Sequence, residues 1–434
     1  MTNKGSRSHI AASALSSMIP RRHFLRSTLL GAMLPFALRA AAEKPRRILL
    51  RSSWQTVNIG DIGHTPGILR LLGECLPQAE ITLWPNDIGN GVEAMLRRNF
   101  PALRIAKDPE SIRAALAECD FMLHGSGPSL VGRKELERWA SETGKPYGIY
   151  GITWSAGEKG PDARTRALLD GAQFLYFRDT ISLQSAKDAG LKTPILEFTP
   201  DAAFAVNLRN DETATAFLKA NQLEDGKYVC VIPRYRNTPY WEIRHKAMTP
   251  EDERKQARNE QMKEHDHAPL RDTIVAVARQ TSMKVLVCPE DESQMAIGKA
   301  MLVDPLPDDV KAKVVWHEHY WLTDEAVSTY ARSAGLFGLE MHSPIMCIGN
   351  GIPAIVCRFK EQTSKGQMWS DVGLGEWLFD MDEETDGKKI TAAVLAMIQE
   401  PAAARAKAAK AREFVEKRER ETMAVVGKAA GVGV

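Results

Sequence analysis

Short apolar runs alternate with helix-period stretches from Arg47 onward, and this alternation sets the expected architecture. In the first half, the runs that predict strands are Ile48–Leu50, Glu80–Leu83, Phe121–Leu123, Tyr147–Ile152, Phe174–Phe177 and Ile195–Phe198. In the second half, they are Tyr228–Ile232, Lys284–Cys288, Lys313–Trp316, Gly335–Leu339 and Ile352–Cys357. Strands that alternate with helices predict mostly parallel sheets. We therefore expect an α/β protein with two Rossmann-like, doubly wound domains that face a cleft.

Two segments depart from this rhythm. Residues 237–267 form a long, highly charged insertion that begins near Tyr240 and Trp241. A loop of that length in a compact domain is usually a lid, a binding element or disordered. Residues 400–427 are rich in Ala, Lys, Arg and Glu, which predicts one long amphipathic helix. The expected domains are 43–215, 216–400 with the insertion, and a C-terminal helix and tail at 401–434.

The N-terminal segment has the features of an export signal. Arg21 and Arg22 precede an apolar run from Leu29 to Leu38, and three alanines end at Ala42. A charged flank, a short apolar core and an Ala-x-Ala end are typical of a cleavable signal. Twin arginines are typical of the Tat variant. We expect residues 1–42 to be removed and the mature protein to be periplasmic; the alternative is an uncleaved helix that anchors the chain to a membrane.

Composition narrows the protein class. Hydrophobic residues make up 44% and charged residues 26% of the 434 residues, which is ordinary for a soluble globular protein. The formal net charge of +2 gives no argument for binding nucleic acid or an anionic membrane surface. The six cysteines include no CxxC pair, and several lie within predicted strands. They are expected to be small buried hydrophobes and not a disulfide framework.

The segment that contains Glu340 and His342 is the richest in candidate chemistry. A predicted strand ends just before this pair, and a helix closed by Gly351 follows it. In open α/β sheets, ligands bind at the carboxyl ends of strands, which is where His342 is expected. Histidine is also the side chain most easily tuned for proton transfer near neutral pH. His342 is therefore either an acid–base group or a residue that only caps the helix.

Two other strand ends carry glycine-bearing turns. One contains Asn58 and Asp61, and the other begins with Gly125 and Ser126. Bare backbone NH groups at such turns, followed by a helix N-terminus, favour an anionic group. Neither turn matches a dinucleotide fingerprint or a Walker loop. Each is a candidate anion site or simply a tight connection.

Two arginines follow predicted strands directly. Arg178 and Arg234 could each aim a guanidinium fork at a carboxylate or a phosphate. For Arg178 the alternative is an ion pair with Asp179 that orders the start of a helix.

Alternate histidines occur twice, at His265 and His267 and at His317 and His319. Such pairs could chelate a transition metal with a third ligand. No third ligand is evident at a fixed spacing, so we predict no metal site.

Together these segments resemble the polysaccharide pyruvyl transferase family. The matching segments, in order, are Asn58-Ile59-Gly60-Asp61, Gly125-Ser126-Gly127, Phe177-Arg178-Asp179, Pro200-Asp201, and Met341-His342-Ser343 through Pro353, with Lys360 or Lys365 beyond. Each motif is loose, whereas their number and order are more specific. The resemblance covers about residues 48–380.

The resemblance implies a fold like that of GT-B glycosyltransferases and transfer of pyruvate from phosphoenolpyruvate onto a sugar, commonly as a cyclic ketal. It implies that His342 is the acid/base, that Arg234 and either Lys360 or Lys365 bind the anionic donor, and that no cofactor is needed. Asn58, Asp61 and the turn from Gly125 and Ser126 to Ser129 would line the first-domain wall. Trp241 would stack on a sugar if the insertion folds over the cleft.

Two features depart from the family pattern. Family members often carry a basic residue two positions before the histidine, and this chain has Glu340. An acid there would repel phosphoenolpyruvate, although it could orient His342 or bind a sugar hydroxyl. Phosphoenolpyruvate is also a cytoplasmic metabolite, whereas the signal predicts export. Both features indicate an altered donor or a changed role.

The leading hypothesis is an exported transferase that acts on an envelope or exported glycan, with a glycan acceptor and an anionic donor as partners. One alternative is a non-catalytic periplasmic glycan-binding protein on the same fold. The other is a sugar-nucleotide glycosyltransferase. None of these hypotheses involves nucleic acid or a membrane span after signal cleavage.

Overall fold

The computed structural model describes residues 45–155, 157 and 160–433. The predicted export signal lies outside the described residues. Residues Pro45–Val434 form one compact unit. Across the described residues, no helix combines the length and apolar character needed to cross a membrane.

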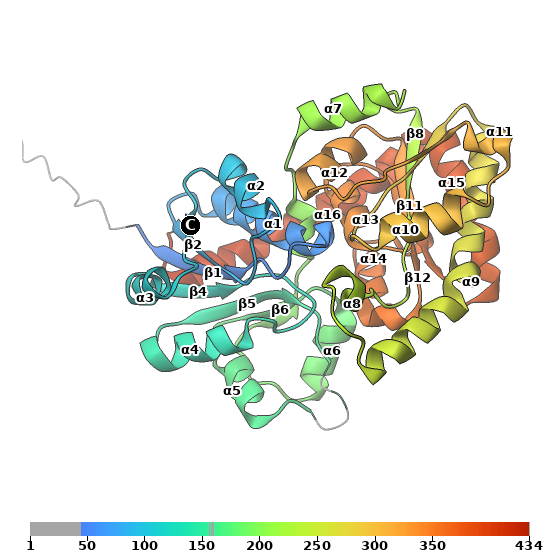
Figure 1. The fold of residues 1–434 in the computed structure, drawn as a ribbon. Helices are drawn as coiled ribbons and strands as arrows, with labels where there is room; N and C mark the ends of the chain where they lie inside the picture. The colour runs from blue at the N-terminus through green and yellow to red at the C-terminus, as the bar shows by residue number, and fades with distance from the viewer. Residues whose placement is uncertain (1–44, 156, 158–159, 434) are drawn as a thin grey trace, which may run out of the picture. The chain divides into compact units, whose positions relative to one another are not determined.

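The first half of this unit is built on a parallel sheet with the strand order β3-β2-β1-β4-β5-β6-β7 (Figure 1). Its strands are β1 (Arg47–Ser52), β2 (Glu80–Pro85), β3 (Arg104–Ile105), β4 (Phe121–His124), β5 (Tyr147–Ile152), β6 (Leu175–Phe177) and β7 (Leu196–Phe198). Its helices are α1 (Ile59–Cys75), α2 (Val92–Asn99), α3 (Pro109–Glu118), α4 (Arg133–Thr143), α5 (Ala163–Gly171) and α6 (Thr180–Asp188). The strand order reverses between β1 and β4, which is where such sheets bind ligands.

The second half has a parallel sheet with the order β10-β9-β8-β11-β12-β13, and its order reverses between β8 and β11. The strands are β8 (Tyr228–Ile232), β9 (Lys284–Val287), β10 (Val314–Trp316), β11 (Gly335–Gly338), β12 (Ala354–Arg358) and β13 (Leu378–Asp380). The main helices are α7 (Asp211–Ala220), α8 (Tyr240–Ile243), α9 (Pro250–Gln280), α10 (Gln294–Gly298), α11 (Asp308–Lys311), α12 (Thr323–Tyr330), α13 (His342–Gly349), α14 (Gln367–Asp371), α15 (Glu384–Gln399) and α16 (Pro401–Ala430). The chain also contains the short 3₁₀ helices η1 (Ala202–Ala205), η3 (Lys360–Gly366) and η4 (Gly375–Trp377).

The predicted fold class is confirmed. Every predicted strand is present to within two residues at either end. The strands β3 and β13 were not predicted, because two or three residues of mixed polarity carry almost no periodic signal. The exact domain boundaries stay predictions.

The charged insertion is not a loop, which corrects the expectation for residues 237–267. It comprises α8 and the first half of α9, a helix of 31 residues. Thr249 and Asp252 form a capping box at its start, with Pro250 in the first turn. Apart from Asn259, the buried residues of α9 begin at Asp266, so the apolar period that marks a helix starts only after the charged stretch has ended.

The long C-terminal helix predicted from residues 400–427 is confirmed as α16, and it contacts both halves of the unit. It packs on α1 and β5 of the first half and on α13 and α15 of the second. The buried positions of α16 are apolar or small apart from Thr422 and Glu419, whose side chain is 3% exposed. Glu419 therefore places an acid inside a helix-packing interface.

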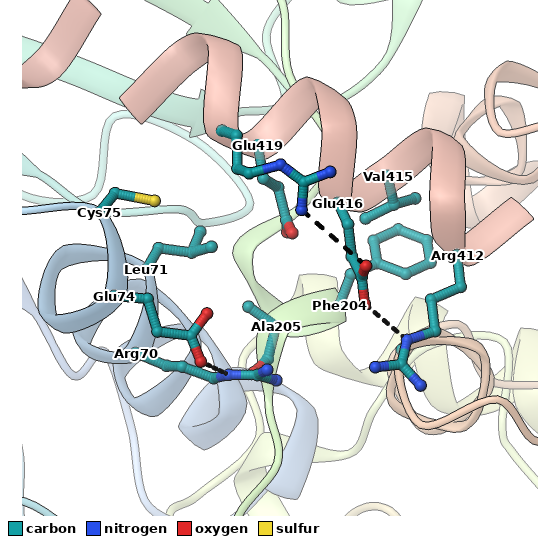
Figure 2. Close-up of a pocket in the computed structure, with 12 residues that line it drawn as sticks. Arg70, Leu71, Glu74, Cys75, Phe204, Ala205, Arg412, Val415, Glu416 and Glu419 are labelled. Atoms are coloured by element: carbon teal, nitrogen blue, oxygen red, sulfur yellow. Dashed lines mark hydrogen bonds and ion pairs between the residues drawn. The ribbon is translucent and has the colours of Figure 1, made fainter. Parts of the chain in front are cut away.

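A pocket of about 220 Å³ adjoins Glu419, between α1, η1 and α16 (Figure 2). Arg70 bonds Glu74 at 2.7 Å, and Arg412 bonds Glu416 at 2.7 Å. The Oε1 atom of Glu419 has no hydrogen-bond partner among the described residues. Burial raises the pKa of Glu419 well above its ordinary value, although Arg70 opposes the shift.

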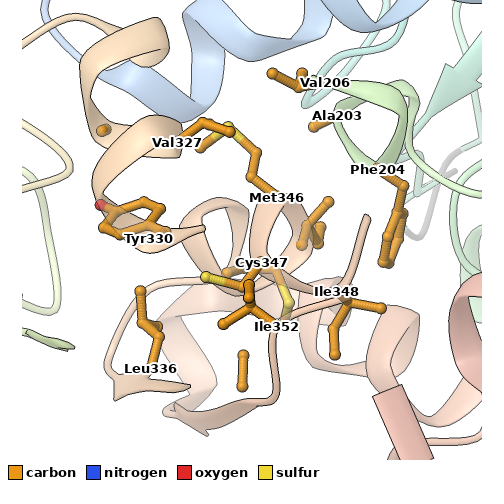
Figure 3. Close-up of a cluster of buried hydrophobic side chains, with 14 of the residues drawn as sticks. Ala203, Phe204, Val206, Val327, Tyr330, Leu336, Met346, Cys347, Ile348 and Ile352 are labelled. Atoms are coloured by element: carbon orange, nitrogen blue, oxygen red, sulfur yellow. The ribbon is translucent and has the colours of Figure 1, made fainter. Parts of the chain in front are cut away.

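One hydrophobic cluster joins the two halves through α13 (Figure 3). Met346 and Ile348 of α13 belong to the same cluster as Phe204 and Val206, which follow the first sheet. A Cβ atom at Gly349 would lie 1.9 Å from the Phe204 carbonyl oxygen, so only glycine allows this approach. The C-terminal half of α13 is therefore held against the first half of the unit.

Candidate functional site

His342 begins α13, and a glycine on α1 makes room for it. The side chain is 4% exposed. A Cβ atom at Gly60 would lie 2.4 Å from the Cβ of His342, which real contacts do not allow. The imidazole meets the ring of His64 edge-on at 4.9 Å. A residue that follows a strand of the second sheet is thus inserted against the first helix of the first half.

Two charged groups set the protonation pattern of His342. Its Nε2 atom lies 3.5 Å from Nη1 of Arg178, and its Nδ1 atom lies 3.5 Å from Oε1 of Glu290. A guanidinium can only donate, so Nε2 is the acceptor and the proton of the neutral ring is assigned to Nδ1. Burial lowers the pKa of His342 well below its ordinary value, helped by His64 and nearby cations. The ring is therefore a neutral base with its lone pair on Nε2.

Glu290 also fixes the start of α13. It follows β9, and its Oε2 atom accepts hydrogen bonds from the backbone N and the Oγ of Ser343, both at 2.7 Å. A carboxylate is favourable at a helix N-terminus. Burial raises the pKa of Glu290, whereas the bonds from Ser343 lower it. Glu290 positions both the helix and the imidazole.

Asp201 is the anionic centre of the first-half wall. Its Oδ2 atom accepts from Arg178 at 2.7 Å, and its Oδ1 atom accepts from Ser126 Oγ and His64 Nδ1, each at 3.0 Å. Burial would raise the pKa of Asp201, but His64 and Arg178 hold it well below the ordinary value. Arg178 is fully buried, and within the part of the chain that the structure describes its Nη2 atom has no hydrogen-bond partner. One donor of Arg178 is thus free to bind a ligand.

The residues predicted to line the wall of the first domain also stabilise the local structure. Asn58 caps α1 by accepting from the backbone N of Gly60 at 2.8 Å and of Asp61 at 3.1 Å. Ser126 is turned toward Asp201 and the Gly151 carbonyl. A Cβ at Gly125 would lie 3.0 Å from the Oγ atom of Ser52, so the turn is close-packed.

Asp61 and Lys365 are the members of the group that solvent partly reaches. Asp61 bonds Gln55, and its side chain is 15% exposed. Burial would raise the pKa of Asp61, but His342, His64 and Lys365 lower it overall. Within the described residues, the side chain of Lys365 has no hydrogen bond or ion pair, and burial together with Arg178 and Arg234 lowers its pKa. Lys360 is exposed. Of the two candidate lysines, the structure brings only Lys365 to this group.

Glu340 and Arg234 form the second-half wall, and they neutralise each other. Arg234 Nη1 lies 2.5 Å from Glu340 Oε2, and Gln294 donates to Glu340 Oε1 at 2.6 Å. Burial raises the pKa of Glu340 to about 7, although Arg234 opposes the shift. Burial and Glu340 raise the pKa of Asp291 to about 6. The arginine expected to bind a donor anion is already engaged by an acid.

Trp241, predicted to stack on a sugar if the insertion folds over the cleft, is buried at 7% exposure, and its stacking role stays a prediction. Tyr240 is instead 37% exposed, and its hydroxyl accepts from Gln55 at 3.0 Å. The aromatic residue that meets the group is thus one position earlier.

A sequence model of the polysaccharide pyruvyl transferase family matches residues 58–360 of this chain. The chain belongs to the polysaccharide pyruvyl transferase family. Membership in this family indicates a transferase and implies a glycan acceptor. No curated protein matches the chain.

Solved structures similar to this family member share its fold at low sequence identity. Phytolacca americana UGT2, complexed with UDP-2-fluoro-glucose and pterostilbene, is 12% identical with a TM-score of 0.52, covering 89% of this chain and 100% of that one. Anabaena Alr3699/HepE with UDP and glucose is 9% identical with a TM-score of 0.53, covering 88% and 100%. A UDP-forming trehalose-phosphate synthase from Burkholderia xenovorans is 9% identical with a TM-score of 0.52, covering 90% and 100%. These likenesses support the GT-B-like architecture alone.

The histidine pairs of this pyruvyl transferase family member have structural roles. His267 binds the Lys263 carbonyl through Nδ1 at 2.6 Å and accepts from the backbone N of Arg234 at 3.3 Å. His317 is packed between Phe217 and Trp321. Neither pair offers two free imidazoles to a metal.

A different set, His64, Asp201 and His342, has ligand atoms within 4.8 Å of one another. Its members are far apart in sequence, so no spacing could reveal it. Arg178 Nη1 lies within 3.5 Å of both Asp201 and His342. A cation therefore already occupies the space between these two ligands, and the set is better described as an ion-pair network.

Sequence reasoning missed Glu290 and His64. Glu290 follows the predicted strand Lys284–Cys288, so the rule applied to other strand ends would have found it. His64 lies on the same helix face as Gly60, but its importance depends on a partner 137 residues away. The site roles predicted for all these residues stay predictions.

Proposed function

We propose that this protein is an exported transferase that moves a pyruvyl or closely related group from an anionic enol phosphate to a sugar hydroxyl. The acceptor is an envelope or exported glycan. The observation that carries the proposal is the neutral, buried His342, held between Glu290 and Arg178 where both sheets end. Family membership supports the reaction class.

The chemistry needs one proton carrier and several cations. A sugar hydroxyl attacks C2 of the enol phosphate, and C3 gains a proton, which gives a tetrahedral adduct. The Nε2 lone pair of His342 takes the hydroxyl proton and delivers it to C3. Phosphate then leaves with the C2–O electron pair, and a second hydroxyl closes the ketal. The proton of that hydroxyl leaves with the phosphate.

Arg178 and Lys365 are the proposed anion ligands. Arg178 has a free buried Nη2 donor, and Lys365 has no ion pair among the described residues. Donors fixed in a site that excludes water stabilise developing charge strongly. Arg234 joins them when Glu340 is protonated, since the pKa of Glu340 is about 7.

Export is part of the proposal because Arg21 and Arg22 precede a signal-like apolar run. The donor must then be one that occurs outside the cytoplasm, which agrees with a site that differs from the usual pattern at Glu340. Fractionation of cells that express the full chain tests this point. Periplasmic protein that is lost when both arginines are replaced by lysine supports Tat export, and unchanged cytoplasmic protein in both strains contradicts it.

A phosphate-release assay tests the activity. Residues 43–434 are incubated with phosphoenolpyruvate and fractionated envelope glycans, and the glycans are examined for an added pyruvyl ketal. Glycan-dependent phosphate release together with that product supports the proposal. Phosphate release at the same rate with and without glycan contradicts the proposal.

The second candidate is a non-catalytic glycan-binding protein. The Arg234–Glu340 pair favours it, because this pair withdraws a cation from the donor. Under this alternative the protein binds glycan without phosphate release, and His342→Ala leaves the binding constant unchanged.

A further inference from the structure

A groove of about 990 Å³ lies between α16 and the segment that runs from α14 to η4. The side chains that matter along it are Asp371, Glu376, Lys407, Lys410 and Phe414. It lies outside the group around His342, and none of the predicted site residues lines it.

Phe414 is the unusual member of this groove. It is 45% exposed, whereas the next residue, Val415, is 1% exposed and faces the core. The packing of α16 therefore does not require the phenyl ring. An exposed aromatic ring within a groove is a candidate binding feature. Its electron-rich face attracts the C–H groups on the flat side of a sugar ring.

The polar residues of the groove suit a hydroxyl-rich ligand. Lys407 pairs with Glu376 and lies over the Trp377 ring at 5.1 Å. The exposed side chain of Lys410, on α16, has no hydrogen bond or ion pair within the described residues. Two acids and two lysines leave the groove without net charge, which favours a neutral polymer over nucleic acid or an anionic lipid surface.

Two stretches of chain link the groove to the candidate site. Asp371 accepts from the backbone N and Oγ of Thr180, each at 2.8 Å, and Thr180 lies two residues beyond Arg178. Lys365 lies in η3, which leads directly into α14. Of the two cations proposed to hold the donor, Arg178 thus lies two residues from a partner of the groove residue Asp371, and Lys365 lies in the turn that precedes α14, part of the groove wall.

We propose that this groove binds the acceptor as an extended glycan chain of neutral hexoses, with one ring stacked on Phe414. Lys410 and Asp371 form hydrogen bonds with its hydroxyls. That the glycan is the acceptor rests on the proposed function, but the binding itself needs no catalysis.

Titration calorimetry with neutral glucose hexasaccharides in β-1,4, β-1,3 and α-1,4 linkage tests whether the groove binds a glycan. The wild type is expected to bind at least one of them. Phe414→Ala should weaken that binding roughly tenfold, the loss of one aromatic stacking contact. Phe414→Trp should retain it. Met248→Ala is the matched control, because Met248 is also an exposed hydrophobic, at 38%.

Equal binding by the wild type and Phe414→Ala, or no binding of any hexasaccharide by the wild type, overturns the inference. A dimer that becomes monomeric in Phe414→Ala also overturns it, because the groove would then be a self-association surface. Phe414-dependent binding without phosphate release leaves this inference standing and removes the proposed reaction. If Phe414→Ala releases phosphate with an unchanged KM for glycan, the proposed reaction stands and this inference is removed.

Discussion

Charge is buried at two places in this molecule, with opposite outcomes. Around His342, Arg178 pairs with Asp201 at 2.7 Å, and the pKa of Asp201 is held well below its ordinary value. Glu419, on α16, is also buried, but its Oε1 atom has no partner among the residues that the structure describes, and its pKa is raised well above the ordinary value. Burial alone neutralises an acid, whereas burial beside fixed donors keeps it ionised. The first arrangement can serve chemistry on an anion, whereas the second favours the protonated, uncharged form of the acid in a packing interface.

The largest expected effect comes from breaking the Arg178–Asp201 pair. Asp201→Asn leaves a fully buried guanidinium without its counter-charge, which should cost about 3–5 kcal/mol of unfolding free energy. Denaturant unfolding measures the loss. Asp309→Asn, which removes an exposed partner of Arg279, should change the unfolding free energy far less, because solvent screens this ion pair. Equal losses in the two variants would contradict the role of Asp201.

A methyl group on α1 tests how closely His342 must be held. Gly60→Ala places a Cβ atom 2.4 Å from the Cβ of His342 and should displace the imidazole. A displacement of about 1 Å can cost roughly 100-fold in kcat. Gly73→Ala is the matched control on the same helix, because a Cβ there meets nothing within 4 Å. Unchanged kcat in a well-folded Gly60→Ala protein would show that the placement of His342 is not critical.

The Glu340–Arg234 pair is intermediate between these two buried acids, because Glu340 has a fixed donor but a raised pKa. Its effect on donor binding should therefore depend on pH. The pKa values of Glu340 and Asp291, about 7 and about 6, mean that the second wall gains negative charge as pH rises from 5.5 to 7.5. The KM for an anionic donor should therefore rise over this range. Glu340→Gln should lower KM at pH 8 by about tenfold, one freed charge contact. The KM of Glu340→Gln should also vary less with pH than the KM of the wild type. Identical pH profiles of KM in the two proteins would contradict this account.

The smallest effect is expected at Glu419. A raised folded pKa stabilises the protein at low pH, and this contribution is lost as pH rises through that pKa. Glu419→Gln mimics the protonated form, so it should match wild type near pH 4, where the carboxyl is protonated in both the folded and the unfolded chain, and unfold at a higher temperature than wild type at pH 9. Glu416→Gln, a partly exposed position, should show no such pH-dependent gain. A destabilised Glu419→Gln at pH 9 would mean that the carboxylate has a partner.

The sheets were predictable because parallel strands are continuous apolar runs. Tyr228–Ile232 is fully buried and was predicted at its observed bounds. Polar residues at strand ends, such as Arg178, Arg234 and His342, were also within reach, because the topology brings carboxyl ends together. The helix α9 was not, since its charged first half shows no apolar period.

Pairings between distant segments could not be predicted. The engagement of Arg234 by Glu340, and of His64 by Asp201, depends on side chains that meet only after both sheets have folded. Gly60 was predicted as part of a motif. The reason that a glycine is needed there is the side chain of His342, which lies far away in the sequence.

The central claim is that His342 carries the proton, and one paired measurement tests it most directly. Donor binding by calorimetry and glycan-dependent phosphate release are measured for wild type and His342→Ala. Donor affinity should change by less than roughly threefold, whereas the rate of phosphate release should fall by about 10²–10⁴. Phosphate release by His342→Ala at the wild-type rate would contradict the account.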